Sequence, residues 1–275
     1  MRPGFNSQQT DMKNDKTSWG KVAGWYSDLL EKEEGTYQKE LILPNLIRLM
    51  EIKRGELVLD LACGQGFFSR EFLKAGAKVI GVDVSKELIG MAEKISKEQK
   101  LKIDYKISPA DNLSFIKEKS IDKIVIVLAI QNIENVAGVF KECQRVLKSS
   151  GKLFLVLNHP AFRIPKQSSW EWDQKTNDQY RRIDQYLSES KIEIQMHPSA
   201  GSGQVPGRKP SEKTISFHRP LQYYFKLLGK NGFAVDRLEE WNSNKKSQPG
   251  PRAKAEDKIR KEIPLFMFLE AIKIK

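Results

Sequence analysis

This chain of 275 residues has few cysteines and no long apolar run. It also lacks the apolar core of a signal peptide near its start. Its two cysteines, Cys63 and Cys143, cannot build a disulfide framework and lack the spacing of metal ligands. The longest apolar stretch, Ile124 to Ile130, is far shorter than the ~20 residues that a bilayer-spanning helix needs. The start of the chain, residues 1–16, is polar and has no signal-peptide core. We therefore expect a soluble cytoplasmic protein with no membrane segment and no metal site.

Acidic residues are also in deficit, since 47 basic residues against 35 acidic ones give a net charge of +12 and a pI near 9.5. Clustered Lys and Arg would indicate nucleic-acid binding. The lysines of this chain are scattered over expected helix faces, which favours a charged surface that keeps the protein soluble. Nucleic acid remains a possible but disfavoured partner. Hydrophobic residues at 39% and charged residues at 30% suit a globular protein.

Strand and helix patterns alternate through the middle of the chain. Apolar or β-branched runs predict strands at 57–61, 78–82, 102–107, 121–128 and 153–157. Helical stripes fall between them, at 69–75, after the N-cap residue Ser85, and at 136–147, where Gly151 is expected to close the helix. The run at 121–128 is nearly all β-branched, as in a strand buried on both faces. This alternation predicts an α/β fold with a doubly wound parallel sheet.

The flanking segments predict elaborations of that sheet within a single domain spanning 18–275. Residues 1–17 are expected to form a disordered lead-in, and helical patterns follow from Ser18 to Met50. After the fifth strand, residues 159–218 form a long insertion of the kind that makes a lid. Inside it we expect a helix through Tyr180, Ile183 and Leu187, strands at 191–196 and 214–217, and a Gly/Ser/Pro-rich loop at 198–211.

The last part of the chain returns to the sheet. A helix is expected from Pro220 until Asn231 and Gly232 end it, followed by strands at 233–241 and 264–274. Residues 242–261 between these strands are polar and basic, and we expect them to be mobile.

The first strand ends in a glycine-rich turn that predicts a ligand site. Asp60 ends the strand, and Ala62, Gly64 and Gly66 follow before a helix begins. Glycine lets the turn adopt angles that a β-carbon forbids and lets a ligand approach the backbone. The helix then presents its free N–H groups to that ligand, at the strand ends where open α/β sheets bind small molecules. As a dinucleotide-binding turn the match is partial, because Ser69 takes the place of the third glycine.

The turn and three later motifs resemble those of class I S-adenosylmethionine-dependent methyltransferases. In that family the first motif is an acidic strand end followed by a small-x-Gly-x-Gly turn, and Asp60, Ala62, Gly64 and Gly66 fit it. The resemblance runs over residues 57–157 and resumes at 220–274. It implies a seven-stranded, mostly parallel, Rossmann-like methyltransferase sheet with N-terminal helices, a lid insertion after the fifth strand, and S-adenosyl-L-methionine as the cofactor, leaving S-adenosyl-L-homocysteine.

The resemblance also assigns roles along the cofactor. Asp83, followed by Val84, would accept hydrogen bonds from the ribose hydroxyls, and Asp111 with Asn112 would hold the adenine. Asp60 would lie near the cationic amino-acid part. The methionine end would be lined by residues that follow the fourth strand: Ala129, Ile130 and Gln131.

Plain alternatives exist for these residues. Asp83 and Asp111 could be turn or N-cap carboxylates, although their place at successive strand ends favours ligand binding. The pair Trp25-Tyr26 resembles aromatic residues that close over this cofactor, which would place Tyr26 in the site. An amphipathic helix also uses such residues for packing alone.

The pair His159-Pro160 after the fifth strand and the run from Phe217 to Leu221 before the next helix resemble the type 11, quinone-biosynthesis-like methyltransferases that act on small molecules. The sulfonium is already a good methyl donor, so positioning of the acceptor, worth ~7–11 kcal/mol, should matter more than a general base, worth a factor of ~10²–10⁴. His159, at the tip of the fifth strand, is the candidate base for an N, O or S nucleophile, or else a histidine bonded within a turn.

The insertion supplies the candidate substrate contacts. Trp170 and Tyr180 could wall the acceptor, Arg181 could clamp an anionic group, and His218 precedes the helix that returns to the sheet. Alternatively, the two aromatic residues pack within the insertion, and Arg181 lies on a solvent-exposed face without binding substrate.

Two other functions stay open. A nucleic-acid methyltransferase would suit the basic charge, but the segment after the fourth strand lacks the Asn/Asp-Pro-Pro-aromatic motif of base amino-group methylation. It also lacks a Pro-Cys nucleophile, and Cys143 falls on a helical stripe. A non-catalytic module that binds S-adenosylmethionine is the second alternative. The sequence carries no signal for an oligomeric state.

Overall fold

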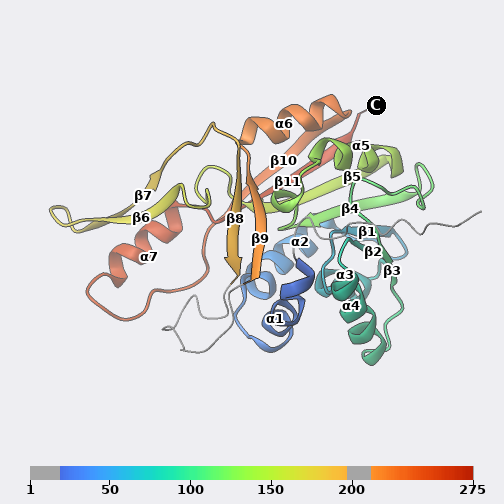
Figure 1. Cartoon of the computed structure of the whole chain (residues 1–275), viewed down its shortest axis with the longest axis horizontal. Helices are drawn as coiled ribbons and strands as arrows, with labels where there is room; N and C mark the ends of the chain where they lie inside the picture. The colour runs from blue at the N-terminus through green and yellow to red at the C-terminus, as the bar shows by residue number, and fades with distance from the viewer. Residues whose placement is uncertain (1–18, 197–211, 275) are drawn as a thin grey trace, which may run out of the picture.

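The computed structural model describes residues 19–196 and 212–274 (Figure 1). The expected lead-in at 1–17 and the expected loop at 198–211 therefore lie outside the described residues. Within them, a seven-stranded sheet has the order β10-β11-β5-β4-β1-β2-β3. Its strands are β1 (Leu57–Leu61), β2 (Lys78–Asp83), β3 (Asp104–Ile107), β4 (Ile121–Val127), β5 (Leu147–Asn158), β10 (Phe233–Trp241) and β11 (Phe266–Lys273).

The strand directions make this a mostly parallel sheet. β1 pairs in parallel with β2 and β4, β2 with β3, and β4 with β5. β11 lies antiparallel to both β5 and β10, so it alone in this sheet runs against the others. The carboxyl ends of β1 to β4 consequently meet at one edge, where a doubly wound sheet binds its ligands. The predicted fold class is confirmed.

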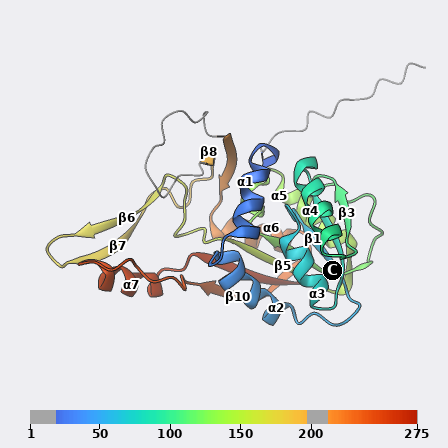
Figure 2. The ribbon, with the colours of Figure 1, turned by 90° about the horizontal axis from the view of Figure 1, so that it is seen from below.

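Helices cover both faces of the sheet (Figures 1 and 2). They are α1 (Trp19–Lys32), the π-helix η1 (Gln38–Ile42), α2 (Leu43–Met50), α3 (Phe67–Lys74), α4 (Lys86–Glu98), the 3₁₀ helix η2 (Ile130–Asn132), α5 (Val136–Val146), α6 (Leu221–Lys230) and α7 (Ala253–Glu262). One core joins α1, α2 and α3 to the sheet, and the other joins α5 and α6 to its opposite face.

Strand β4 shows why a continuous β-branched run folds this way. Successive strand residues point to opposite faces, so Ile124 and Ile126 enter the core beneath α5, whereas Val125 enters the core on the α3 side. All three are fully buried. A strand with an apolar layer on each face needs consecutive apolar residues, and the run from Ile124 to Val127 provides them after the charged pair Asp122-Lys123.

The insertion differs from the prediction in its first half. The helix expected through Tyr180, Ile183 and Leu187 is absent from the described residues, which instead form a hairpin of β6 (Ser168–Asp173) and β7 (Asp178–Ile183). Burial along β7 alternates residue by residue, the period of a strand. Asn177 takes a left-handed conformation (φ 57°) in the turn, which Asn tolerates better than most residues. The helical prediction was wrong because its aromatic spacing suited either period.

The second half of the insertion follows the prediction more closely. β8 (Ser190–Met196) and β9 (Glu212–His218) form an antiparallel ribbon. This ribbon lies beside α1, while the β6–β7 hairpin extends away from the central sheet with α7 along it (Figures 1 and 2).

One smaller expectation was also wrong, and a second segment contains a helix that was not expected. The helix α5 ends at Val146, and Gly151 lies inside β5, where a β-carbon would meet the Leu147 side chain at 2.8 Å and the Lys148 carbonyl at 3.0 Å. The polar segment 242–261, expected to be mobile, contains most of α7. Arg252, just before this helix, lies 4.7 Å over the Trp172 ring of the hairpin, which helps to hold it. Among the described residues, no helix combines the length and apolarity of a membrane span.

Candidate functional site

A cavity of about 1100 Å³ opens where the carboxyl ends of the parallel strands meet. Four of its lining residues come from successive strand ends: Asp60 from β1, Asp83 from β2, Asp111 after β3 and Ala129 after β4. This volume exceeds the upper end of ordinary small-molecule pockets, about 1,000 Å³. The cavity therefore has room for more than one small ligand.

Asp83 joins the glycine turn to the start of α4. Its Oδ2 accepts a hydrogen bond from the Gly64 amide at 2.8 Å, and its Oδ1 accepts one from the Ser85 amide at 2.9 Å. Ser85 in turn caps α4 by accepting from the Leu88 amide at 3.2 Å. Burial raises the pKa of Asp83, and the backbone amides act against that shift. A carboxylate has about four acceptor sites, so two bonds to the backbone leave acceptor capacity for a ligand.

Asp60 is the more deeply buried carboxyl, with 2% of its surface exposed. The Ser69 hydroxyl donates to its Oδ2 at 2.5 Å. Burial, aided by the nearby negative charge of Asp83, raises the pKa of Asp60 to about 7. Asp60 is therefore partly protonated near neutral pH, and a cation in the cavity would favour its charged form.

The turn between β1 and α3 depends on close backbone packing. Gly64 and Gly66 both have left-handed angles, with φ of 56° and 77°. A β-carbon on Gly66 would lie only 2.3 Å from the Tyr105 hydroxyl oxygen, so no larger residue fits without movement. Ala62 (φ 61°) and Leu128 (φ 53°) adopt the same region without being glycine, and both line the cavity. Such angles cost non-glycine residues about 1–2 kcal/mol.

Asp111 is fixed by a residue that the sequence reasoning missed. Asn135 donates from Nδ2 to Asp111 Oδ2 at 2.7 Å, and its Oδ1 caps α5 by accepting from the Gly138 amide at 3.1 Å. Both residues line the cavity. The position of an Asn directly before the clearest helical stripe was the available signal.

The other predicted cofactor residues divide into two groups. Ala62, Gly64, Val84 and Ala129 line the cavity, whereas Gly66, Asn112 and Gln131 lie beside it without forming its wall. Gln131 donates to the Leu128 carbonyl at 2.8 Å. Its buried Oε1 has no protein partner within the described part of the chain. Tyr26 belongs to α1, but its side chain lies outside what the structure describes.

His159 is not among the residues that line the cavity. Its Nδ1 accepts from the Ala161 amide at 3.2 Å, so Nε2 carries the proton and donates to Glu240 Oε1 at 2.7 Å. The ring packs on Phe162, and burial lowers the pKa of His159. With both nitrogens occupied, the geometry favours a structural histidine over the predicted general base.

The predicted substrate residues of the insertion also lie away from the cavity wall. Trp170 and Tyr180 belong to the projecting hairpin, where Tyr180 is 49% exposed. Arg181 bonds to the Phe162 carbonyl and the Ser168 hydroxyl, which ties the hairpin to the chain before it.

In the second ribbon the neighbour of the predicted residue reaches the cavity. His218 is buried and donates from Nε2 to the Tyr186 carbonyl at 2.8 Å, whereas Phe217 lines the cavity. Lys191, paired with Phe217 across the ribbon, lines it too. Trp19 and Leu30 of α1 complete this side. The alternation of side chains along β9 could have indicated this choice, because adjacent residues of a strand face opposite sides.

Comparison with known proteins shows which family the central region is similar to. Residues 59–155 match the family model described as "Methyltransferase domain". This matched methyltransferase domain contains Asp60, Asp83 and Asp111, and the match supports the class I, S-adenosylmethionine-dependent type.

Curated relatives are similar to this domain and its surroundings. The chain is 29% identical over 123 residues to a ubiquinone biosynthesis O-methyltransferase of Xanthomonas oryzae pv. oryzae, covering 43% of this chain and 52% of that protein. It is 34% identical over 98 residues to the protein of the same name from Pelagibacter ubique, covering 36% and 40% respectively. The chain thus spans about half or less of the length of these relatives.

Solved structures show the same fold over a greater length. An S-adenosylmethionine-dependent methyltransferase from Mesorhizobium loti matches with a TM-score of 0.63 at 23% identity, covering 86% of this chain and 99% of that one. A protein described as a putative enzyme of the same kind from Listeria monocytogenes matches with a TM-score of 0.61 at 23% identity, covering 85% and 97%. The methyltransferase domain therefore lies within a methyltransferase-like fold that extends over most of the chain.

The residues of the cavity fit an adenosyl cofactor. Gly64 of the glycine turn, the carboxylates at the ends of β1 and β2, and Asp111 beyond β3 all line the cavity, where they offer backbone groups and acceptors to a ligand. Of these, Asp60 is the carboxyl that a cationic group would keep ionised.

Proposed function

We propose that this chain transfers a methyl group from S-adenosyl-L-methionine to a nucleophile on a small molecule. The observation that carries the proposal is the convergence of Asp60, Asp83 and Asp111 on one large cavity within the methyltransferase domain. When bound, the cofactor supplies a methyl group already activated by its sulfonium.

The protein's own residues would bind and orient. Asp83 would accept from the ribose hydroxyls, Asp111 would hold the adenine, and Asp60 would face the ammonium group of the amino-acid end. Phe217 and Lys191 of the ribbon, with Trp19 of α1, line the remaining part of the cavity and would enclose the acceptor. Holding two reactants in line and excluding water would supply most of the catalysis.

An oxygen acceptor is the chemistry that we favour among N, O and S nucleophiles. The support is the printed name of the relatives, which are O-methyltransferases. The cavity lining includes the aromatic residues Phe67 and Phe68 at the start of α3 and Phe217 of the ribbon, which suit an acceptor with an apolar or aromatic body.

Calorimetry with S-adenosylhomocysteine tests the cofactor. We expect clear binding by the wild-type protein, no binding of NAD, and a loss of affinity of about 100-fold for Asp83→Asn, because hydrogen bonds to a charged group contribute about 1.5–3 kcal/mol each. Asp104→Asn, an exposed carboxylate on β3, is the matched control and should bind normally. Unchanged affinity in Asp83→Asn would overturn the assignment of this site.

Transfer of label from methyl-labelled S-adenosylmethionine tests the reaction. A metabolite extract and a panel of phenols, amines and thiols would be compared with total RNA. Label in a small hydroxyl compound supports the proposal. Label in RNA alone would establish the nucleic-acid alternative, and cofactor binding without transfer to any acceptor would favour a non-catalytic module.

A further inference from the structure

Arg70 is the largest side chain that is almost fully buried in the described structure, and its charge needs explanation. It lies on α3, one turn beyond the glycine turn, and only 2% of it is exposed. A buried cation is costly unless it is paired and its hydrogen-bond donors are satisfied. Its partners therefore show what the charge holds together.

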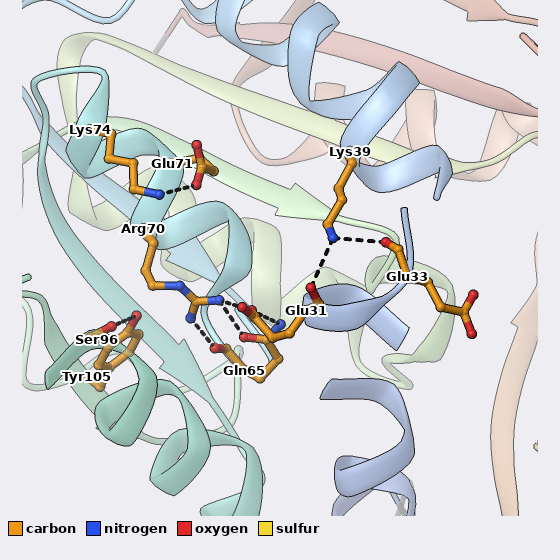
Figure 3. Close-up of polar contacts among 9 residues, drawn as sticks. All are labelled: Glu31, Glu33, Lys39, Gln65, Arg70, Glu71, Lys74, Ser96 and Tyr105. Atoms are coloured by element: carbon orange, nitrogen blue, oxygen red, sulfur yellow. Dashed lines mark hydrogen bonds and ion pairs between the residues drawn. The ribbon is translucent and has the colours of Figure 1, made fainter. Parts of the chain in front are cut away.

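Those partners belong to two different elements (Figure 3). Arg70 donates from Nη1 to the Gln65 carbonyl at 2.7 Å and from Nη2 to the Gln65 side-chain oxygen at 2.9 Å. Nη2 also donates to the Glu31 carboxylate, which forms its one ion pair among the described residues. Gln65 closes the ring by donating from Nε2 to the same Glu31 oxygen at 3.1 Å.

Gln65 belongs to the glycine turn, between Gly64 and Gly66, whereas Glu31 belongs to α1. The same helix contributes Trp19 and Leu30 to the cavity wall. Its end is held further by Lys39, which donates to the Glu31 and Glu33 carbonyls at 3.3 and 2.9 Å (Figure 3). One buried guanidinium thus connects a wall of the cavity to the turn that forms its floor.

We infer that Arg70 is a positioning residue whose pairing with Glu31 couples the docking of α1 to the geometry of the glycine turn, and hence to the affinity for the adenosyl cofactor. This inference rests on the proposed function. Without α1 in place, Arg70 would keep its bonds to Gln65 but lose its carboxylate partner. A ligand that orders the turn would then stabilise the docked position of α1. Docking of α1 would in turn raise the affinity for the ligand by the same factor.

The test uses Glu31→Gln, which keeps the shape and acceptor oxygen of the side chain but removes its charge. Glu31 is about one-third exposed, so this variant should fold. We expect its affinity for S-adenosylhomocysteine in calorimetry to fall at least about fivefold, the lower range of coupling between sites. Asp28→Asn is the control, because Asp28 is an exposed carboxylate on the same helix, paired with Lys32.

Hydrogen exchange of residues 19–32, compared with and without ligand, provides a second readout, because a merely structural role would raise exchange equally in both states. We expect faster exchange in Glu31→Gln than in the wild type without ligand, and recovery of protection when S-adenosylhomocysteine saturates the protein. In Arg70→Met, the added change Glu31→Gln should have no further effect on affinity, because the pair acts as one unit.

The outcomes separate the two claims. If the wild type does not bind S-adenosylhomocysteine, the proposed function fails and the coupling fails with it. If the wild type binds and Glu31→Gln binds equally well, with α1 equally protected, the coupling alone is overturned. Additive losses in the double variant would also overturn it, since they would mean that Arg70 and Glu31 act independently.

Discussion

The floor and the roof of the cavity are built in different ways. The floor consists of strand ends such as those of β1 and β4, each of which has a neighbour on both sides and an apolar core on both faces. The roof includes the β8–β9 ribbon, whose strands pair with each other and with no further strand among the residues that the structure describes. Two-stranded ribbons are marginally stable without other support. A rigid floor suits a ligand that is always bound in the same way, and a ribbon with less support can adapt to the acceptor.

The largest expected effect lies in the floor. Gly66→Val should destabilise the protein by about 2–5 kcal/mol, the sum of overpacking and a left-handed angle. The new side chain would collide with Tyr105. Urea unfolding would measure the loss. Gly90→Ala on α4, where a β-carbon meets no atom within 4 Å, is the control. A stability change in Gly66→Val no larger than in the control would mean that the floor is not rigid.

The next test concerns His159, which lies outside the cavity wall. His159→Ala should reduce stability by about 1–3 kcal/mol, because the Ala161 amide and Glu240 lose their partner. Turnover per folded molecule should stay within about twofold, a bound set by the small rate effect expected of a residue that does not transfer the proton. Thermal unfolding and an activity assay on the same samples would measure both. A large fall in turnover with stability intact would restore His159 as the general base.

The two ribbons can be compared directly. Phe217→Ala removes a residue of the cavity wall and should lower kcat/KM for the acceptor about tenfold, corresponding to about 1.4 kcal/mol. Tyr180→Ala removes a similar ring from the projecting hairpin, where it is 49% exposed, and should leave kcat/KM unchanged. Steady-state kinetics with the acceptor found by labelling would measure both. Equal effects of the two changes would show that the hairpin also reaches the substrate.

The smallest expected effect is a pH dependence in the floor. The pKa of Asp60 is about 7 when no cation is present, above its ordinary value of 3.8. Binding of a cationic ligand at pH 6 must therefore release a proton, and the affinity for S-adenosylhomocysteine should rise up to about tenfold from pH 6 to pH 8.

The same shift has a consequence for stability. Because the folded-state pKa is raised, the folded protein binds more protons than the unfolded chain between pH 3.8 and 7, and stability falls as the pH rises through this window. Calorimetry at pH 6, 7 and 8 would measure the affinity, and Asp60→Asn should remove the dependence. An affinity that is flat in the wild type would place the ammonium group elsewhere.

The floor was predictable because its positions follow from local rules. A buried parallel strand leaves its carboxyl end at one edge, so Asp60, Asp83 and Asp111 were expected together before any contact was known. The alternation in β4 and the cap at Ser85 are equally local. Even here, Asn135 was missed, although its place before a helix was visible.

The roof was harder to predict because its contacts depend on partners far along the chain. His159 ends the fifth strand as expected, but its role is set by Glu240, 81 residues away. The choice between Phe217 and His218 depends on which face of β9 meets the cavity, and that depends on the packing of β9 against η2 and α1. The aromatic residues near Tyr180 allowed either a helix or a strand until β6 was available as a pairing partner.

The left-handed backbone at Ala62 and Leu128 has a consequence for protein engineering. Glycine would relieve the steric cost of these angles, but its own greater freedom in the unfolded chain would cancel much of that gain. At Ala62 thermostability therefore gives little reason to prefer one residue over the other, whereas glycine at Leu128 would also lose packing against the core on the α3 side. What changes is the volume of the cavity. Ala62 and Leu128 line it with a methyl and an isobutyl group, and glycine at either position would remove these atoms. These two sites are therefore the places to enlarge the cavity for bulkier synthetic cofactors.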